Sequence, residues 1–204
     1  MTDRQIDAVL CDLDGVLRIW ADLGEVDAAY GLPAGTVAGA AFRDERLLPA
    51  VTGLVTDEQW RAGVAEDLVA VCGSAERAGA VVAAWGRQPF RVDAEVVALL
   101  AEVRRRVPVL LVSNGTTRLE ADLAALGLDT AVDGVVNTAR LGAAKPDARV
   151  YLAAAARAEV PPGRCLFVDD SAGNVAAAEA LGMLGHRHRD AAGLRAALSG
   201  HGLV

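Results

Sequence analysis

Apolar runs of four residues stand at three widely separated places in the chain, and each ends directly in polar residues. Residues 8–11 lead into Asp12, residues 109–112 into Ser113, and residues 165–168 into Asp169. Continuous apolar runs of this kind are typical of strands that are buried on both faces of a parallel sheet. The polar residues that follow them would then meet in the crevice at the carboxyl ends of the strands, where open α/β sheets bind ligands.

Strand-like and helix-like segments alternate regularly in the second half of the chain. The hydrophobic spacing predicts strands over 108–113, 134–137, 165–169 and 183–187, and helices over 93–106, 117–127, 147–158, 172–182 and 190–198. Such alternation predicts an α/β fold, a doubly wound parallel sheet with helices on both faces.

A helical insertion interrupts this alternation after the first strand. Between residues 17 and 91 the spacing predicts no strand, but helices over 22–30, 34–42, 57–71 and 75–85, separated by Pro33, Pro49 and Gly73. Thr56 and Gln59 have the spacing of a capping box for the third of these helices. We therefore predict an α/β core formed by 1–16 and 92–204, with a helical cap, 17–91, over the carboxyl ends of the strands.

The first polar group after a strand pairs two carboxylates. Asp12 and Asp14 are two residues apart, so they would share a face of an extended strand end, and Gly15 lets the backbone turn sharply after them. One carboxylate could act as a nucleophile and the other as a proton donor or acceptor. The simpler interpretation is a turn that ends a strand with two solvated acids.

Two further groups have the chemistry of anion and cation binding. Ser113 and Asn114 precede a helix whose first amides can bind an anion, although both residue types are also common helix caps. Asp169 and Asp170 are adjacent acids at the end of a buried strand, and an uncompensated pair there is costly. A divalent cation or a lysine would relieve this cost.

Lys145 is the only lysine among the twenty basic residues of the chain; the rest are arginines. An ammonium is a compact point charge that fits between two carboxylates and a phosphoryl oxygen, whereas a guanidinium is a flat fork. A requirement for a point charge at position 145 would explain why a lysine stands there and not an arginine. The alternative is that a single lysine among twenty basic residues merely reflects codon bias.

Composition narrows the class of protein further. A chain of 204 residues with a net charge of −7 and no extended basic block is not expected to bind nucleic acid. No run is long and apolar enough for a membrane span, and residues 1–5 lack a signal-peptide pattern. The three cysteines have no metal or disulfide spacing, so a reducing, cytoplasmic location is expected. The oligomeric state is not predicted.

Taken in order, these groups resemble the four motifs of the haloacid dehalogenase (HAD) superfamily, in its subgroup with a helical cap after the first strand. The resembling segments are 12–17, 113–114, 145–147 and 169–174, and the flanking residues 141–151 and 53–60 agree with the family as well. Within the superfamily the chain is most similar to sugar-phosphate phosphatases and to the amino-terminal phosphatase domain of soluble epoxide hydrolase. Asn174 departs from the commonest fourth motif, which has an aspartate there.

The resemblance implies a role for each site residue. Asp12 would be the nucleophile that becomes an aspartyl phosphate, and Asp14 the general acid and then base. Ser113 and Asn114 would hold phosphoryl oxygens, and Lys145 would neutralise charge beside Asp12. Magnesium would be bound by Asp170, the Asp12 carboxylate and the Asp14 backbone carbonyl, with Asp169 and Asn174 as supports.

The predicted function is therefore magnesium-dependent hydrolysis of a small-molecule phosphate monoester. The alternatives are a phosphomutase, a 2-haloacid dehalogenase, which would need no acid at position 14, and a non-catalytic phosphate-binding protein. Selectivity is expected to come from the cap, where Trp20 and Phe42 are candidates for contact with the non-phosphate end of the substrate; burial in the core of the cap is the alternative for each.

Overall fold

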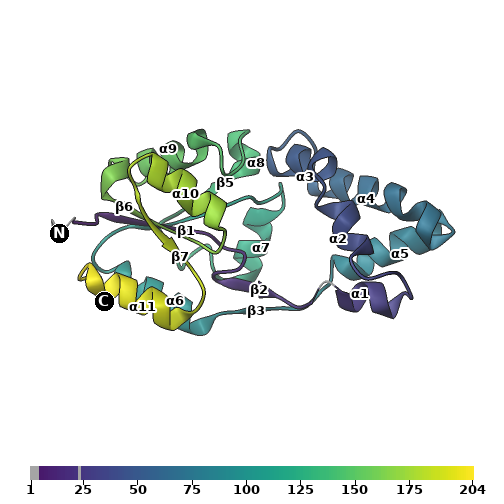
Figure 1. Ribbon diagram of the computed structural model, residues 1–204, viewed down its shortest axis with the longest axis horizontal. Coiled ribbons are helices and arrows are strands. Elements are labelled where there is room, and N and C mark those ends of the chain that lie inside the picture. The colour runs from purple at the N-terminus through teal and green to yellow at the C-terminus, as the bar shows by residue number, and fades with distance from the viewer. Residues whose placement is uncertain (1–4, 23) are drawn as a thin grey trace.

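Five parallel strands form the central sheet of the protein, in the order β5-β4-β1-β6-β7 (Figure 1). The computed structural model describes residues 5–22 and 24–204; residues 1–4, within the segment without a signal-peptide pattern, and residue 23, within the predicted helix 22–30, lie outside the described residues. The strands are β1 (Ala8–Cys11), β4 (Val109–Ser113), β5 (Gly134–Asn137), β6 (Cys165–Asp169) and β7 (Leu184–Arg187).

The central position of β1 brings the three apolar runs of the sequence side by side. Val9 is in register with Val109 of β4 on one side and with Leu166 of β6 on the other. Both neighbours are parallel to β1, so Asp12, Ser113 and Asp169 come to the same edge of the sheet. The edge at which the sequence predicted a site is thus formed by adjacent strands.

Helices cover both faces of the sheet, which confirms the predicted doubly wound α/β fold. Alternate residues of β1 point to opposite faces, where they enter separate apolar clusters. One face is covered by α6 (Ala94–Val103), α7 (Leu119–Leu126) and α11 (Ala191–Gly200), and the other by α9 (Ala148–Arg157) and α10 (Ala172–Ala180). The short helix α8 (Thr138–Leu141) and the 3-10 turn η1 (Pro162–Arg164) complete the connections.

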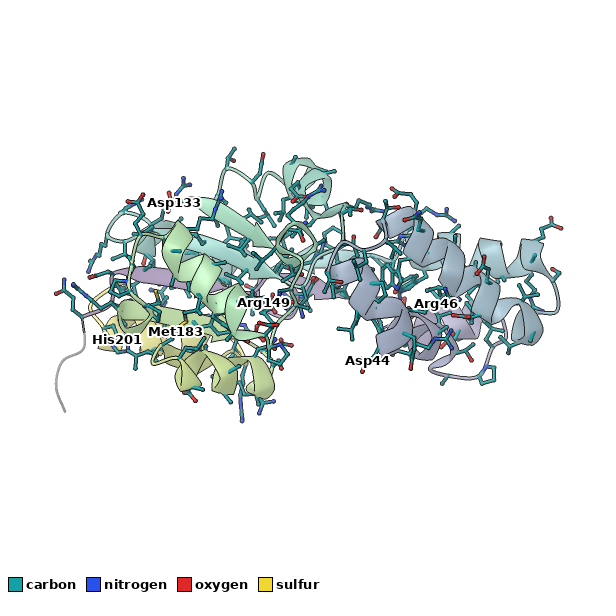
Figure 2. The ribbon with its side chains drawn as sticks, turned by 90° about the horizontal axis from the view of Figure 1, so that it is seen from above. Asp44, Arg46, Asp133, Arg149, Met183 and His201 are labelled. Carbon is teal, nitrogen blue, oxygen red and sulfur yellow. The ribbon has the colours of Figure 1, made fainter. Side chains whose placement is uncertain are left out.

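Residues of the insertion form a helical body with its own apolar core, built around Trp60, Val64, Val81 and Trp85. Its helices lie together at one end of the molecule, and a view from above shows Asp44 and Arg46 there, with Asp133 and His201 on the α/β part (Figures 1 and 2). They are α1 (Gly24–Ala29), α2 (Thr36–Ala41), α3 (Asp44–Val51), α4 (Asp57–Cys72) and α5 (Ala75–Trp85).

The predicted capping box at the start of α4 is present. The Thr56 hydroxyl accepts from the Gln59 amide at 3.2 Å, and the Gln59 side chain accepts from the Thr56 amide at 2.8 Å. Two backbone donors at the helix start are thereby satisfied.

The prediction that Pro49 separates helices was wrong, because Pro49 lies inside α3. Proline removes one hydrogen bond and crowds the preceding turn. Here α3 ends two residues after Pro49, and the Pro49 carbonyl accepts from the amides of Leu54 and Val55 beyond the helix. Arg46 also joins α3 to α4, since its Nε donates to Asp67 at 2.7 Å. These contacts favour a helix that local propensity disfavours.

The prediction of no strands between residues 17 and 91 was also wrong. β2 (Arg18–Trp20) pairs with β3 (Phe90–Val92) in an antiparallel ribbon, with Ile19 opposite Arg91. The two segments are three residues long and are far apart in sequence, so their pairing leaves no local signal. The ribbon brings the segment in which the chain leaves the α/β core next to the segment in which it re-enters the core.

No helix among the described residues is both long enough and apolar enough to cross a membrane.

Candidate active site

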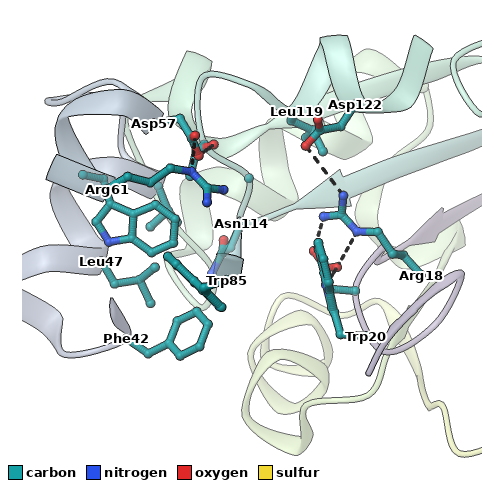
Figure 3. Close-up of a pocket in the computed structure, with 15 residues that line it drawn as sticks. Arg18, Trp20, Phe42, Leu47, Asp57, Arg61, Trp85, Asn114, Leu119 and Asp122 are labelled. Carbon is teal, nitrogen blue, oxygen red and sulfur yellow. Dashed lines mark hydrogen bonds and ion pairs between the residues drawn. The ribbon is translucent and has the colours of Figure 1, made fainter. Parts of the chain in front are cut away.

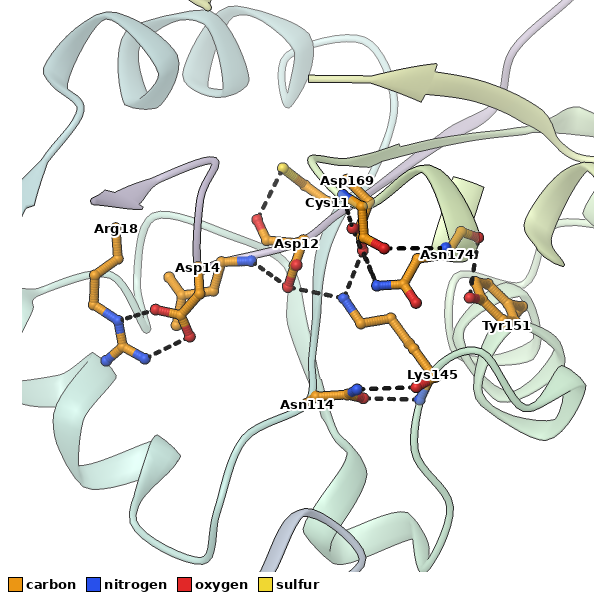
Figure 4. A network of polar contacts seen from close by, with 11 residues as sticks. Cys11, Asp12, Asp14, Arg18, Asn114, Lys145, Tyr151, Asp169 and Asn174 are labelled. Atoms are coloured by element: carbon orange, nitrogen blue, oxygen red, sulfur yellow. Dashed lines mark hydrogen bonds and ion pairs between the residues drawn. The ribbon is translucent and has the colours of Figure 1, made fainter. Parts of the chain in front are cut away.

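Asp12 directly follows the central strand, and its carboxylate is held from two directions (Figure 4). The Leu13 amide donates to Asp12 Oδ1 at 2.7 Å, and Lys145 Nζ lies 2.9 Å from the same oxygen. Asp12 Oδ2 has no hydrogen-bond partner among the described residues. One oxygen is therefore fixed by donors, and the other remains open to an electrophile.

Lys145 stands between two carboxylates, as the point-charge argument predicts. Its Nζ is 2.9 Å from Asp12 Oδ1 and 2.7 Å from Asp169 Oδ2, and its side chain is 1% exposed. Burial acts to lower the pKa of Lys145, but the charges of Asp12 and Asp169 outweigh it and raise that pKa above its ordinary value. The side chain is thus a fixed cation, and its contact with a phosphoryl oxygen stays a prediction.

Asp169 is fully buried and serves to position other groups. Its Oδ1 accepts from the Ser171 amide at 2.9 Å, its Oδ2 accepts from Lys145, and both oxygens accept from Asn174 Nδ2 at 3.1 Å. Because Asn174 is neutral it donates to Asp169, where an aspartate would repel it. The departure at position 174 therefore has a structural role that the motif pattern did not indicate.

The carboxylates outnumber the cations that face them at the strand ends. Asp12, Asp169 and Asp170 each offer an oxygen within 4.8 Å of the others, and Lys145 is the only ammonium in the group. Burial raises the pKa of Asp12 to about 7, despite the opposing charge of Lys145. The pKa of Asp170 is also raised, chiefly by burial and to a lesser extent by the negative charge of Asp169. This excess of oxygen ligands and negative charge fits a hard divalent cation such as magnesium.

Gly15 permits the close approach of Asp170 to the loop after β1. A Cβ atom at position 15 would lie 2.3 Å from Asp170 Oδ2, and the backbone there has a φ of +82°. A larger residue would push Asp170 away from Asp12 and would also be strained. The glycine of the first motif thus makes room for the acid of the fourth.

The side chain of Asn114 binds the backbone of Lys145. Asn114 Nδ2 donates to the Lys145 carbonyl at 3.0 Å, and the Lys145 amide donates to Asn114 Oδ1 at 2.8 Å. The predicted contact of this side chain with phosphoryl oxygens stays a prediction, and the structure shows a positioning role. The hydroxyl of the buried Ser113 has no hydrogen-bond partner among the described residues and remains available to an anion.

Asp14 faces away from Asp12 and Lys145 (Figure 4). Its carboxylate accepts from Arg18 Nε at 2.7 Å, from Arg18 Nη2 at 2.8 Å and from Trp20 Nε1 at 2.6 Å. The three donors come from β2, and neither the pairing of Arg18 with Asp14 nor that of Trp20 with Asp14 was predicted from the sequence. For Asp14 to exchange a proton at the site, its side chain must leave Arg18 and rotate toward Asp12.

A cavity of about 270 Å³ opens from this edge of the sheet toward the helices of residues 24–85 (Figure 3). Asp14 and Asn114 line it on the strand side. Trp20 and Phe42 line it too, with 41% and 43% of their surface exposed, so neither is buried in a core. Five other lining residues could not be predicted from the sequence, because the helices that carry them come together only in the fold. They are Asp57, Trp60, Arg61, Trp85 and Asp122.

The chain belongs to the haloacid dehalogenase-like hydrolases, whose family model matches residues 6–182. It is therefore an enzyme of the hydrolase class, and its resemblance to the HAD superfamily is confirmed. No curated protein is similar to the chain at a significant level of sequence similarity.

Solved structures of HAD enzymes share the fold. A HAD family enzyme from Bacteroides thetaiotaomicron, in complex with magnesium and inorganic phosphate, has a TM-score of 0.70 and 20% identity over 90% of this chain and 94% of its own. A HAD-like hydrolase from Porphyromonas gingivalis has a TM-score of 0.69 and 23% identity, over 89% of this chain and 90% of its own. L-2-haloacid dehalogenase from Xanthobacter autotrophicus, with chloropropionic acid covalently bound, has a TM-score of 0.63 and 20% identity, over 98% of this chain and 85% of its own. At these identities the likeness shows the fold alone.

Proposed function

We propose that this hydrolase is a magnesium-dependent phosphatase that cleaves a small-molecule phosphate monoester through an aspartyl phosphate on Asp12. The observation that carries the proposal is the uncompensated acidic group of Asp12, Asp169 and Asp170 beside a single ammonium. An alkyl-transfer reaction on Asp12 needs no metal ion and hence no further carboxylate to bind one, whereas the magnesium ion that neutralises a phosphoryl group needs carboxylate oxygens as ligands.

Asp12 and Asp170 would hold the magnesium ion, with the Asp14 carbonyl, while Asp169 keeps Lys145 in place. When bound, magnesium would supply a positive charge that neutralises the phosphoryl oxygens and favours the ionised form of Asp12. Lys145 would neutralise the remaining charge, and the Ser113 hydroxyl would donate to a phosphoryl oxygen.

The reaction would proceed in two displacements at phosphorus. Asp12 Oδ2, the oxygen without a partner, forms a bond to phosphorus as the bond to the leaving oxygen breaks, and Asp14 gives that oxygen a proton. Asp14 then takes a proton from water, whose oxygen attacks phosphorus and releases Asp12 and inorganic phosphate. Each step requires the side chain of Asp14 to have turned from Arg18 to the site.

Hydrolysis of p-nitrophenyl phosphate tests the proposal. We expect activity with magnesium, loss of activity in excess chelator and recovery when magnesium is restored. The same preparation should not release halide from 2-chloropropionate. Halide release without added metal, or full phosphatase activity in chelator, would contradict the assignment.

Phosphomutase activity is the remaining alternative, and the same enzyme preparation can test it. A mutase would return the phosphoryl group to a substrate hydroxyl and release little inorganic phosphate. We expect stoichiometric release of phosphate from every ester that is consumed.

A further inference from the structure

The cavity beside Asp14 contains an unusual share of the aromatic residues of the chain. All three tryptophans and one of the three phenylalanines line it, although aromatic residues make up only 4% of the sequence. Phe42, Trp60 and Trp85 form one wall, with ring centroids 5.2 to 6.4 Å apart. Aromatic side chains gathered around a cavity provide apolar contact area for a ligand.

Arg61 is one of the polar residues that line the cavity, and it is held in place by a buried acid (Figure 3). Arg61 Nε donates to Asp57 Oδ2 at 2.6 Å, and Asp57 Oδ1 accepts from the Thr116 hydroxyl at 2.9 Å. The Arg61 guanidinium carbon is 5.1 Å from the Trp85 ring centroid. Neither terminal NH₂ group of Arg61 has a hydrogen-bond partner among the described residues.

Two features of this arrangement limit what the cavity can accept. The aromatic wall offers few hydrogen-bond partners to the several hydroxyl groups of a sugar, and a buried hydroxyl without a partner is costly. The free NH₂ groups of Arg61, in contrast, would be left unsatisfied by a purely hydrocarbon ligand. A carboxylate accepts charge-assisted hydrogen bonds from a guanidinium, and these are stronger than those between neutral groups.

We propose that this cavity receives the leaving group of the substrate, and that the leaving group is a flat, apolar ring carrying an acceptor that Arg61 binds. The inference rests on the proposed function, because Asp14 would protonate the leaving oxygen and Asp14 borders the cavity. An apolar cavity of roughly 150 Å³ is enough for a benzene ring. The cavity of about 270 Å³ therefore accommodates a substituted ring.

Esters of two primary alcohols separate ring binding from leaving-group chemistry. We expect kcat/KM for benzyl phosphate to exceed that for glycerol 3-phosphate by about tenfold or more, the range that apolar pocket contacts supply. Glucose 6-phosphate should resemble glycerol 3-phosphate. Equal or higher kcat/KM for the two polyhydroxylated esters would overturn the proposal.

Adjacent leucines of α3 offer a matched pair of variants. Leu47 lines the cavity, whereas Leu48 does not and is 47% exposed. Leu47→Ala should lower kcat/KM for benzyl phosphate by a larger factor than kcat/KM for glycerol 3-phosphate, while Leu48→Ala should leave the ratio of the two values at its wild-type level. An unaltered preference in Leu47→Ala would contradict a substrate ring in this cavity.

Arg61 and the exposed Arg87 provide the second matched pair. A carboxylate at the 4-position of benzyl phosphate should raise kcat/KM about tenfold, as a charge-assisted hydrogen bond would. Arg61→Met should abolish this gain and Arg87→Met should keep it. If the carboxylate brings no gain in the wild type, the acceptor part of the proposal is wrong.

A binding measurement distinguishes failure of this inference from failure of the proposed function. Benzylphosphonate cannot be hydrolysed, and its binding should quench the fluorescence of the tryptophans around the cavity. Tighter binding than that of methylphosphonate, weakened by Leu47→Ala, would support the ring site even if no ester were hydrolysed. Equal affinity of the two phosphonates would overturn the inference whatever the activity.

Discussion

Lys145 shows how far one side chain is constrained by its neighbours. Its ammonium contacts both Asp12 and Asp169, and the side chain is almost completely buried. Lys145→Arg keeps the charge but places a wide fork where a point charge fits. We expect kcat for p-nitrophenyl phosphate to fall on the order of tenfold or more, equivalent to at least ~1.4 kcal/mol in the barrier. A wild-type rate in a folded Lys145→Arg variant would mean that the point charge is not required.

Asp14 is expected to act on the leaving group, which gives its substitution a distinctive signature. Asp14→Asn should slow hydrolysis by roughly 10² to 10⁴ when the leaving oxygen needs a proton, as in an alkyl phosphate. The loss should be smaller for p-nitrophenyl phosphate, because p-nitrophenolate departs without protonation. The values of kcat/KM for both esters check this, because kcat/KM reports the first displacement and not the later hydrolysis of the aspartyl phosphate that both esters share; equal losses in kcat/KM would exclude Asp14 as the acid.

The raised pKa of Asp12 predicts a pH dependence for magnesium binding. Burial places this pKa at about 7 in the metal-free protein, so below that pH the carboxyl carries a proton that the ion must displace. The apparent affinity should therefore rise by up to about tenfold per pH unit below 7 and level off above it. Calorimetric titrations from pH 5.5 to 8.5 test this. Affinity that is constant over the range would contradict a role for Asp12 as a ligand.

At the level of elements, Asp57 joins the start of α4 to the loop after β4. Its buried carboxylate accepts from the Thr116 hydroxyl, and its amide donates to the Thr117 hydroxyl at 3.0 Å. Thr116→Val removes one donor from a buried charge and should lower the free energy of unfolding by about 1–3 kcal/mol. Thr130→Val, at an exposed hydroxyl, is the control. Urea denaturation curves that coincide for the two variants would show that the contact adds no stability.

Elements were predictable where the signal is local. The buried strands β1, β4 and β6 are continuous apolar runs, and the capping box of α4 involves residues three apart. In contrast, the β2–β3 ribbon depends on pairing between residues about seventy positions apart, and neither strand is apolar throughout. α3 depends on the Arg46–Asp67 contact between helices, which outweighs the local effect of Pro49.

For the molecule as a whole, the position of the site could be predicted because parallel strands bring their carboxyl ends to one edge. Asp12 and Asp169 meet there as the strand order requires, and Lys145, from the loop before α9, lies between them. The orientation of Asp14 could not be predicted, because it depends on Arg18 and Trp20 of a ribbon with no sequence signal. The aromatic cavity was equally hidden, since its walls come from helices whose packing is non-local.

The phosphorylated form of Asp12 is the most direct test of the account. Enzyme quenched in acid during turnover of p-nitrophenyl phosphate with magnesium, then digested and analysed by mass spectrometry, should carry one phosphoryl group on the peptide that contains Asp12. The phosphopeptide should be absent from the Asp12→Asn variant and from wild-type enzyme incubated with the substrate in excess chelator before the acid quench. Turnover by Asp12→Asn, or a phosphoryl group on a different residue of the wild type, would contradict the proposed mechanism.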